Sequence, residues 1–358
     1  MEVHNIENEN GSFPILIDKK MKLIKPVYVY IKEIFNDGKA FNTMKAYTKD
    51  LKVFWEFLTY NHLDFEEVAP ADISSFRMFL LMDDPYNDLP ILYNESKRSP
   101  ATVNRILSTV HGFYVYWAEV RNFNNPILMK SMPSHFRPFK GLLHHIQKKN
   151  LDKSIFKVKT QVQPFNLLSY EQIKSIANAI DNKRDRLIWK ILATTGARIQ
   201  EVLNLTYSNL PIPSHENEMS VIKNVKSKGK NRDIIIPTDM LIELDEYIME
   251  VRDYIDVEHE YVFVALSKKH YGKQLTYSAC YQKFKNLKEI VGFDFNFHDL
   301  RHTFATDLLE AGHDSAIVKD IMGHKHISTT EKYVHVRKTH QKNALTAYWK
   351  LKGIDWEE

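Results

Sequence analysis

The sequence predicts a mainly helical chain with a small β-sheet, an α+β fold divided between two domains. The chain has 358 residues, more than one average globular unit, so two domains are the prior expectation. Apolar side chains recur at helical spacing in the first third and again after Gln274. Between these parts, short apolar runs flank a lysine-rich segment, as in a β-hairpin.

The first third of the chain predicts three helices. One covers residues 43–58 and begins near Asn42 or Thr43, either of which is a suitable N-cap. A second follows Pro70, and a third begins at Ser99-Pro100, where proline occupies the first turn and its missing N–H is not needed. We expect their apolar faces to form a core from Met44, Tyr47, Leu51, Phe54, Trp55, Leu58, Ile73, Phe76, Phe79, Leu80, Val103, Ile106, Leu107, Val110, Tyr114 and Trp117.

The periodicity weakens over residues 133–163, which contain two prolines and a lysine run. This segment is the expected basic linker. It separates an N-terminal extension (1–20) and a helical domain (21–132) from a second domain (164–358) that ends in a tail helix. The second domain opens with a capping box, Ser169 to Gln172. We expect strands at 220–222, 234–236 and 261–264, the first two joined by a lysine-rich tip.

Composition excludes several classes of protein. No apolar run approaches the roughly 18 residues that a membrane span requires, and residues 1–10 have no secretion-signal pattern. Cys280 is the single cysteine, which excludes an internal disulfide framework and a cysteine-based zinc site. The histidines lack partners at metal-ligand spacing, so we expect no metal and no cofactor. These features predict a soluble cytoplasmic protein, associated with a bacterial nucleoid if it binds DNA.

The charge of the chain fits DNA binding without demanding it. The formal net charge is +4 and the isoelectric point is near 8.7. The basic residues gather in two runs, one in the expected linker and one at the expected hairpin tip; the second comprises Lys223, Lys226, Lys228, Lys230 and Arg232. Each run alone is as well explained by a solvated loop.

Three short motifs carry the residues needed for cleavage of a phosphodiester. Arg198 stands in A-T-T-G-A-R-I-Q-E-V-L-N-L, His298 and Arg301 stand one helical turn apart in H-D-L-R, and G-H-K-H-I-S-T-T-E-K-Y contains His324 and Tyr333. Fixed arginines suit the extra negative charge that develops on the phosphate oxygens, because the guanidinium fork holds two oxygens and keeps its charge. A nucleophile and a proton donor for the leaving oxygen complete the requirement.

Together and in this order, the motifs resemble those of the tyrosine recombinases of the phage-integrase family, T-G-x-R-x-x-E-x-x-x-L, H-x-x-R and G-H-x-x-x-x-T-T-x-x-Y. The resemblance covers the C-terminal half of the chain. The helical first third resembles the family's core-binding domain in its general pattern, including S-P-A-T-V-N-R-I-L-S-T-V. The resemblance implies a core-binding domain followed by a mixed α/β catalytic domain.

The resemblance also implies a role for each motif residue. Tyr333 would attack the scissile phosphate to give a 3′-phosphotyrosyl bond, and Arg198 and Arg301 would hold the phosphate oxygens. His324 would donate to the same oxygens, and His298 would assist proton movement. Glu201 is expected to orient the site without touching DNA. DNA contacts are expected at Lys226, Lys230, Arg232 and Arg105.

The proton donor is a lysine of the hairpin in the family, placed just before a glycine. Lys228 matches best, although Lys226 and Lys230 remain alternatives, because a shift of one residue turns a strand side chain to the other face. The run S-K-G-K-N-R is one residue shorter after the glycine than the family pattern. Ala197, Gln200 and Met322 are the other departures, and none removes a reacting group.

These implications predict a recombinase that grips double-stranded DNA between two domains and acts as a homotetramer on two synapsed duplexes. Accessory DNA-bending or transposon-encoded proteins are expected partners, and a mobile-element integrase or transposase is favoured over a resolvase. The apolar face of residues 344–351 is expected to pack on a neighbouring protomer or on its own domain. The alternatives are a type IB topoisomerase, which relaxes one DNA molecule, and a catalytically silent DNA-binding protein of the same fold.

Overall fold

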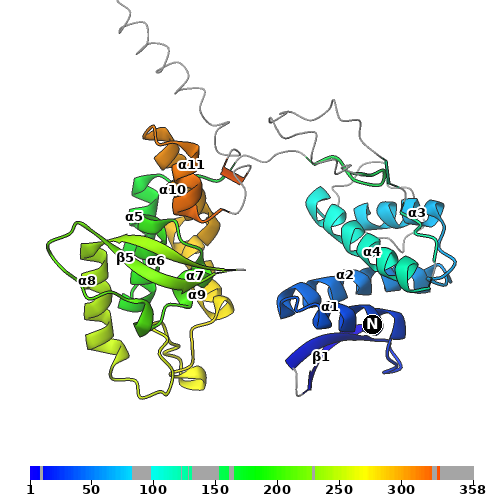
Figure 1. The fold of residues 1–358 in the computed structure, drawn as a ribbon, viewed down its shortest axis with the longest axis horizontal. Helices are drawn as coiled ribbons and strands as arrows, with labels where there is room; N and C mark the ends of the chain where they lie inside the picture. The colour runs from blue at the N-terminus through cyan, green and yellow to red at the C-terminus, as the bar shows by residue number, and fades with distance from the viewer. Residues whose placement is uncertain are drawn as a thin grey trace, which may run out of the picture. The chain divides into compact units, whose positions relative to one another are not determined.

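The computed structural model describes residues 1–8, 11–82, 98–121, 123–127, 129–130, 153–160, 165–227, 230–324 and 329–330 (Figure 1). The chain divides into two compact units, Met1–Val162 and Gln163–Glu358. Each is mainly helical and carries short antiparallel strand pairs. The α+β fold class is therefore confirmed. Within the described part of the chain, no helix combines the length and the apolarity needed to cross a membrane.

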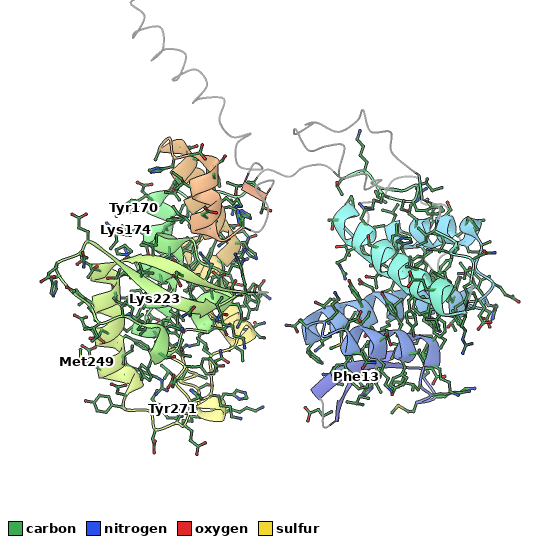
Figure 2. All side chains as sticks on the ribbon, in the orientation of Figure 1. Phe13, Tyr170, Lys174, Lys223, Met249 and Tyr271 are labelled. Atoms are coloured by element: carbon green, nitrogen blue, oxygen red, sulfur yellow. The ribbon has the colours of Figure 1, made fainter. Side chains whose placement is uncertain are left out.

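The first unit begins with a β-hairpin, which the sequence analysis did not predict. Strands β1 (Glu2–Asn8) and β2 (Gly11–Ile17) pair antiparallel, and β2 packs on helices α1 (Lys25–Asn36) and α2 (Phe41–Tyr60). Phe13, labelled in Figure 2, and Leu16 are buried in the core of this unit. Residues 1–20, expected as an extension, thus contribute to the core.

The core of the first unit is built on the predicted helical faces. Helices α3 (Pro70–Leu81) and α4 (Pro100–Arg121) pack on each other and on α2. All the apolar positions predicted for these helices are buried except Tyr47, which is half-buried. Many are aromatic rings in edge-to-face contact, such as Phe54 with Phe76.

Part of the expected linker belongs to the first unit. Strands β3 (Met129–Lys130) and β4 (Lys153–Ser154) pair antiparallel, and Phe156 is buried in the core. The side chain of Asn104 on α4 donates to the carbonyl of Val158 and accepts from its amide, both at 2.8 Å. Residues 131–152 and 161–164 lie outside the described residues.

The second unit surrounds helix α6 (Lys183–Thr195), which contacts α5 (Tyr170–Asn178), α8 (Thr238–Tyr247), α10 (Phe297–Glu310) and strand β6 (Asn231–Pro237). Strand β6 pairs with β5 (Met219–Lys226). The connections contain short helical turns, which are the 3-10 helices η2 (Tyr207–Asn209) and η4 (Lys268–His270) and the π-helix η3 (Ile248–Arg252). The unit is completed by α7 (Ile199–Leu203), α9 (Tyr277–Val291) and α11 (Ser315–Met322). The predicted capping box at Ser169 and Gln172 is present at the start of α5.

The prediction of a strand at residues 261–264 is wrong. Val262 to Val264 are fully buried, but the backbone makes isolated bridges instead of a ladder, one between Tyr261 and Thr206 and one between Val264 and Gln274. Arg252 donates to the carbonyl of Tyr261. A short apolar run indicates burial, and burial here comes from helices and loops around an irregular segment.

Candidate active site

The first motif forms the sharp turn between α6 and α7. Gly196 ends α6 in the left-handed conformation, with φ of 59°. A Cβ at this position would lie 2.4 Å from Cδ1 of Phe304 on α10, so the turn needs glycine for its conformation and for the close approach. Arg198 is the N-cap of α7 and is about one-third exposed.

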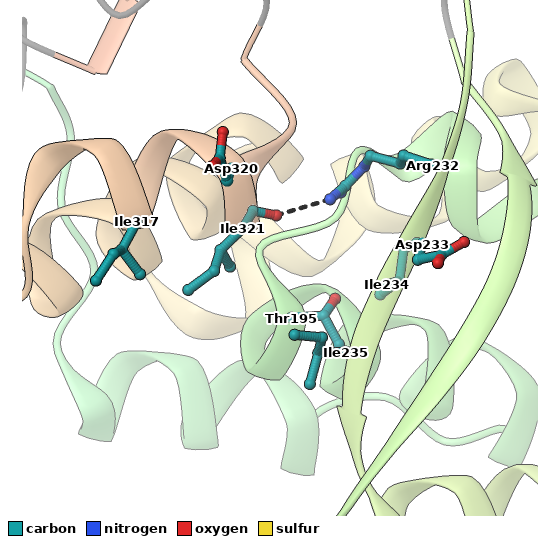
Figure 3. Close-up of a pocket in the computed structure, with 8 residues that line it drawn as sticks. All are labelled: Thr195, Arg232, Asp233, Ile234, Ile235, Ile317, Asp320 and Ile321. Atoms are coloured by element: carbon teal, nitrogen blue, oxygen red, sulfur yellow. Dashed lines mark hydrogen bonds between the residues drawn. The ribbon is translucent and has the colours of Figure 1, made fainter.

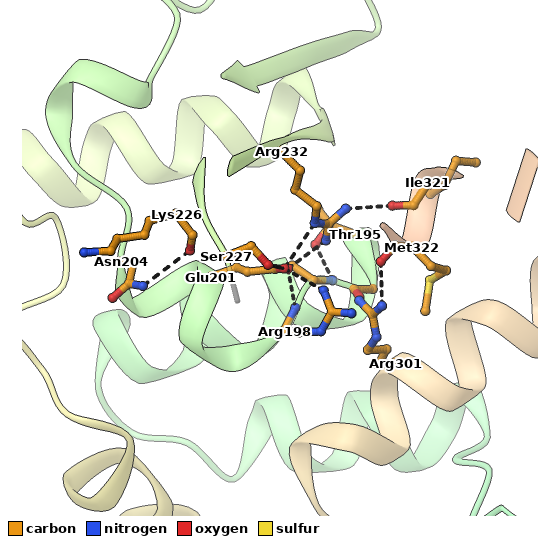
Figure 4. Close-up of polar contacts among 12 residues, drawn as sticks. Thr195, Arg198, Glu201, Asn204, Lys226, Ser227, Arg232, Arg301, Ile321 and Met322 are labelled. Carbon is orange, nitrogen blue, oxygen red and sulfur yellow. Dashed lines mark hydrogen bonds and ion pairs between the residues drawn. The ribbon is translucent and has the colours of Figure 1, made fainter. Parts of the chain in front are cut away.

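Arg301 connects this turn to the end of α11. Arg301 is 5% exposed, and its guanidinium donates from Nη1 to the carbonyl of Gly196 at 2.6 Å and from Nη2 to that of Met322 at 2.5 Å (Figure 4). One arginine on α10 therefore holds the backbone two residues before Arg198 and immediately before Gly323-His324. The three motifs, which are far apart in the sequence, meet at this side chain.

His324 lies at the end of α11. Gly323 ends that helix in the left-handed conformation, with φ of 61°, and turns the chain so that His324 is buried, 8% exposed. The imidazole Nδ1 is 2.9 Å from Oγ1 of Thr330, which is fully buried. This contact fixes the orientation of the ring.

Glu201 is the most highly connected carboxylate of the site. It is 1% exposed and accepts hydrogen bonds from the Arg198 amide and Nη1, both at 2.8 Å, and from Ser227 Oγ at 2.5 Å. Arg232 donates to it from Nε and Nη2 at 3.2 and 2.7 Å. Although burial alone would raise the pKa of Glu201, the hydrogen bonds and charge of Arg232, with Ser227 and the Arg198 amide, lower it to about 2. Glu201 therefore stays ionised and orients Arg198.

The two histidines are held in the neutral form at neutral pH. Desolvation, followed by the charges of Arg301, Arg198 and Arg232, lowers the pKa of His324 to about 4. The His298 side chain reaches the surface on α10, yet partial desolvation and the charges of Arg301 and Arg198 also lower its pKa. The positive charges of Arg198 and Arg301 thus act on both rings.

The hairpin β5–β6 brings lysines to this site. Val225 pairs with Arg232 and Lys226 with Asn231, after a bulge between Ile222 and Val225. Lys226 and Lys230 are exposed on either side of the tip. Lys228, the preferred proton donor, and Tyr333, the expected nucleophile, lie outside the described residues.

Two expected DNA contacts have protein partners in this structure. Arg232 is 9% exposed and is bonded to Glu201 and to the carbonyl of Ile321, so its guanidinium belongs to the interior of the site. Arg105, in the first unit, is half-exposed but donates from Nη1 to both oxygens of buried Asp50 at 2.6 Å. The contacts of the Gly196 and Met322 carbonyls were not predicted, because backbone acceptors leave no side-chain pattern, and the bond from the Ser227 hydroxyl to Glu201 was not predicted either.

A surface pocket of about 440 Å³ lies beside Arg232, between β6 and α11 (Figure 3). Its lining is mainly isoleucine, with two carboxylates: Thr195, Arg232, Asp233, Ile234, Ile235, Ile317, Asp320 and Ile321. Arg232 alone of these residues contacts Glu201, so the pocket adjoins the motif cluster without containing Arg198 or the histidines. Within the described part of the chain, no three His, Cys, Asp or Glu side chains are grouped to hold a metal ion.

Comparison with known proteins agrees with the arrangement of the motifs. The model of the phage integrase family matches residues 166–340. Transposase A from transposon Tn554 of Staphylococcus aureus is 30% identical over 361 residues, covering 98% of this chain and 99% of that protein. Tyrosine recombinase XerC of Staphylococcus epidermidis is 27% identical over 88% of this chain and 93% of its own length.

A solved structure shows the same fold. The XerH site-specific recombinase bound to palindromic difH substrate superimposes with a TM-score of 0.61 at 19% identity, over 90% of this chain and 84% of that chain. Fold and motif cluster thus define a phage-integrase type of protein. The chain belongs to the phage integrase family of tyrosine recombinases.

Proposed function

We propose that this chain is the site-specific recombinase of a mobile genetic element, and that it cleaves and rejoins duplex DNA through a covalent bond between Tyr333 and a 3′-phosphate. The observation that carries the proposal is that Arg301, on the same helix as His298, bonds to the carbonyl of Gly196 in the turn of Arg198 and to the carbonyl of Met322 in the turn of His324. Similarity to a transposase along almost the whole chain supports the mobile-element role.

In the cleavage step, the Tyr333 oxygen attacks phosphorus and the bond to the 5′-oxygen breaks. The electron pair leaves with that oxygen, which takes a proton and departs as a 5′-hydroxyl. Arg198 and Arg301 stabilise the charge on the non-bridging oxygens, and each such donor typically contributes a factor of about 10²–10³ in rate. Rejoining reverses these steps with the 5′-hydroxyl of another strand, so the phosphodiester energy is conserved and no metal or cofactor is needed.

Proton transfer is assigned to the hairpin and the histidines. We assign protonation of the leaving oxygen to Lys228, the hairpin lysine that matches the family pattern best. His324, neutral at pH 7, donates a hydrogen bond to a phosphate oxygen from the nitrogen that does not face Thr330. His298, also neutral, accepts the tyrosine proton as attack begins.

The proposed substrate is double-stranded DNA, which exposed Lys226 and Lys230 contact through its phosphates. Strand exchange between two duplexes requires four active sites, so the working form is a homotetramer on synapsed DNA, assisted by DNA-bending or element-encoded proteins and located at the nucleoid. Residues 344–351, proposed to join the protomers, lie outside the described residues.

The test uses duplexes that carry the junctions between the element and its genomic flanks. A recombinase joins strands from two differently labelled duplexes, and the labels appear together in one product. Relaxation of a single supercoiled plasmid without joined products would support the topoisomerase alternative. Binding without any covalent product would support a silent DNA-binding protein.

A further inference from the structure

Arg232 has contacts that suit a role other than DNA binding. Its side chain crosses from β6 to two other elements: Nε and Nη2 bond to Glu201 on α7, and Nη1 donates to the carbonyl of Ile321 on α11 at 2.7 Å (Figure 4). We propose that Arg232 is a positioning residue that fixes the base of the lysine hairpin, the Glu201–Arg198 pair and the turn before His324 in one active arrangement. The inference rests on the proposed recombinase function and deepens it.

The packing around Gly323 supports this role. A Cβ at Gly323 would lie 2.6 Å from Cδ of Arg232, so the arginine stem lies directly against the turn that presents His324. The left-handed conformation of Gly323 and the bond from Arg232 to Ile321 together set the direction in which the chain leaves α11. Displacement of Arg232 would therefore move His324 as well as Glu201.

The hairpin is held from both of its strands by one carboxylate. Ser227, which follows β5, and Arg232, on β6, both donate to Glu201, and Arg232 pairs across the hairpin with Val225. Ser227 and Arg232, on either side of the hairpin tip, are thereby fixed relative to Arg198, which the same carboxylate orients. A lysine delivered from this tip is thus placed with respect to a phosphate held by Arg198.

A phosphate contact by Arg232 would conflict with these bonds. The side chain is 9% exposed, and turning it towards DNA would remove two hydrogen bonds from a carboxylate that is 1% exposed. Leaving a buried carboxylate short of partners is strongly unfavourable. Arginine is required because its planar fork reaches the carboxylate and the carbonyl together, whereas a lysine has one nitrogen to place.

The test separates binding from chemistry in the full-length protein. The native chain is compared on nicked suicide duplexes with three variants, Arg232→Met, Arg232→Lys and Lys230→Met. Two quantities are measured for each protein: the rate of covalent adduct formation at saturating protein, and the salt dependence of the non-covalent affinity for DNA. Lys230→Met is the matched control for loss of one exposed charge from the same hairpin. Adduct formation by the native chain is the separate control for the proposed function, and its absence there would refute that function independently of Arg232.

For a positioning residue, Arg232→Met retains the salt slope and binds DNA within about twofold of the native chain. Its adduct rate falls about 10²-fold, the typical effect of a misplacement near 1 Å, and Arg232→Lys does not restore it. Arg232→Met added to Glu201→Gln lowers the rate no further than Glu201→Gln alone, because the two act as one unit. Retained DNA affinity shows that the variants are folded, and Arg232→Lys, which keeps the charge, serves if Arg232→Met does not fold.

A DNA-contacting arginine would give the opposite pattern. Arg232→Met would then resemble Lys230→Met, with weaker binding, a salt slope smaller by about 1, and recovery in Arg232→Lys. That pattern, or an adduct rate for Arg232→Met within about threefold of native, would overturn the proposal.

Discussion

Replacing Gly196 with alanine tests the turn that places Arg198. At φ of 59°, an L-residue is strained by about 1–2 kcal/mol, and the new Cβ would lie 2.4 Å from Phe304 Cδ1. Relief of that overlap adds about 1–3 kcal/mol, so the total loss of stability in the second unit is about 2–5 kcal/mol. The shift also moves the carbonyl that Arg301 binds, and adduct formation should fall about 10²-fold.

Gly292 provides the matched control. It ends α9 in the same left-handed conformation, with φ of 79°, but no atom lies within 4 Å of an added Cβ. Gly292→Ala should therefore lower the stability only by the backbone strain of a left-handed L-residue, about 1–2 kcal/mol, and should keep native activity. The assay is amide hydrogen exchange of peptides from α6 and α9, with adduct rates measured in parallel. Equal destabilisation by the two substitutions, or native activity of Gly196→Ala, would refute the close-packing argument.

Three further predictions concern charge and anchoring. The pKa of histidine is near 6.5 in the unfolded chain and about 4 for folded His324, so the unfolded state takes up the proton first as the pH falls. The stability of the second unit should therefore fall by at most about 3 kcal/mol as the pH drops from 6.5 to 4. His324→Gln should flatten this decline when denaturation is measured as a function of pH. Glu201→Gln should destabilise by about 3–5 kcal/mol in urea denaturation because it leaves Arg232 buried without its charged partner. Glu243→Gln, which breaks the partly exposed pair with Lys190, should change stability by less than about 1 kcal/mol, and a similar loss for both would contradict the burial argument. Asn104→Ala should speed hydrogen exchange of residues 153–160, whereas Ser108→Ala, one turn along the exposed face of α4, should not; unchanged exchange would contradict the anchoring by Asn104.

The long helices and the motif residues were predictable because their signals are local. Helical periodicity identified α2, α3 and α4, and the side chains on their predicted faces are buried. Fixed spacing in three short motifs identified Arg198, Arg301 and His324, whose proximity the structure displays.

The β-hairpin at residues 2–17 and the role of Arg232 were not predictable in the same way. Strand β1 is mainly polar and β2 contains a proline, and the apolar residues of β2 are explained by the α1–α2 surface on which it packs, which no local pattern shows. Arg232 stands in a basic run, where the pattern favours a solvent-facing DNA contact. Its actual partners, Glu201 and the Ile321 carbonyl, come from segments 31 and 89 residues distant, and one partner is a backbone atom.

The central claim is that Tyr333 forms the covalent bond to DNA, with the phosphate held by the cluster around Arg301. The most direct measurement incubates the full-length chain with a nicked suicide duplex from the element's junction and identifies the modified peptide by mass spectrometry. We predict a 3′-phosphotyrosyl adduct on Tyr333 that is abolished in Tyr333→Phe and retained in Tyr254→Phe, a substitution at an exposed tyrosine of the second unit. An adduct that persists in Tyr333→Phe, or that maps to another residue, would contradict the assignment.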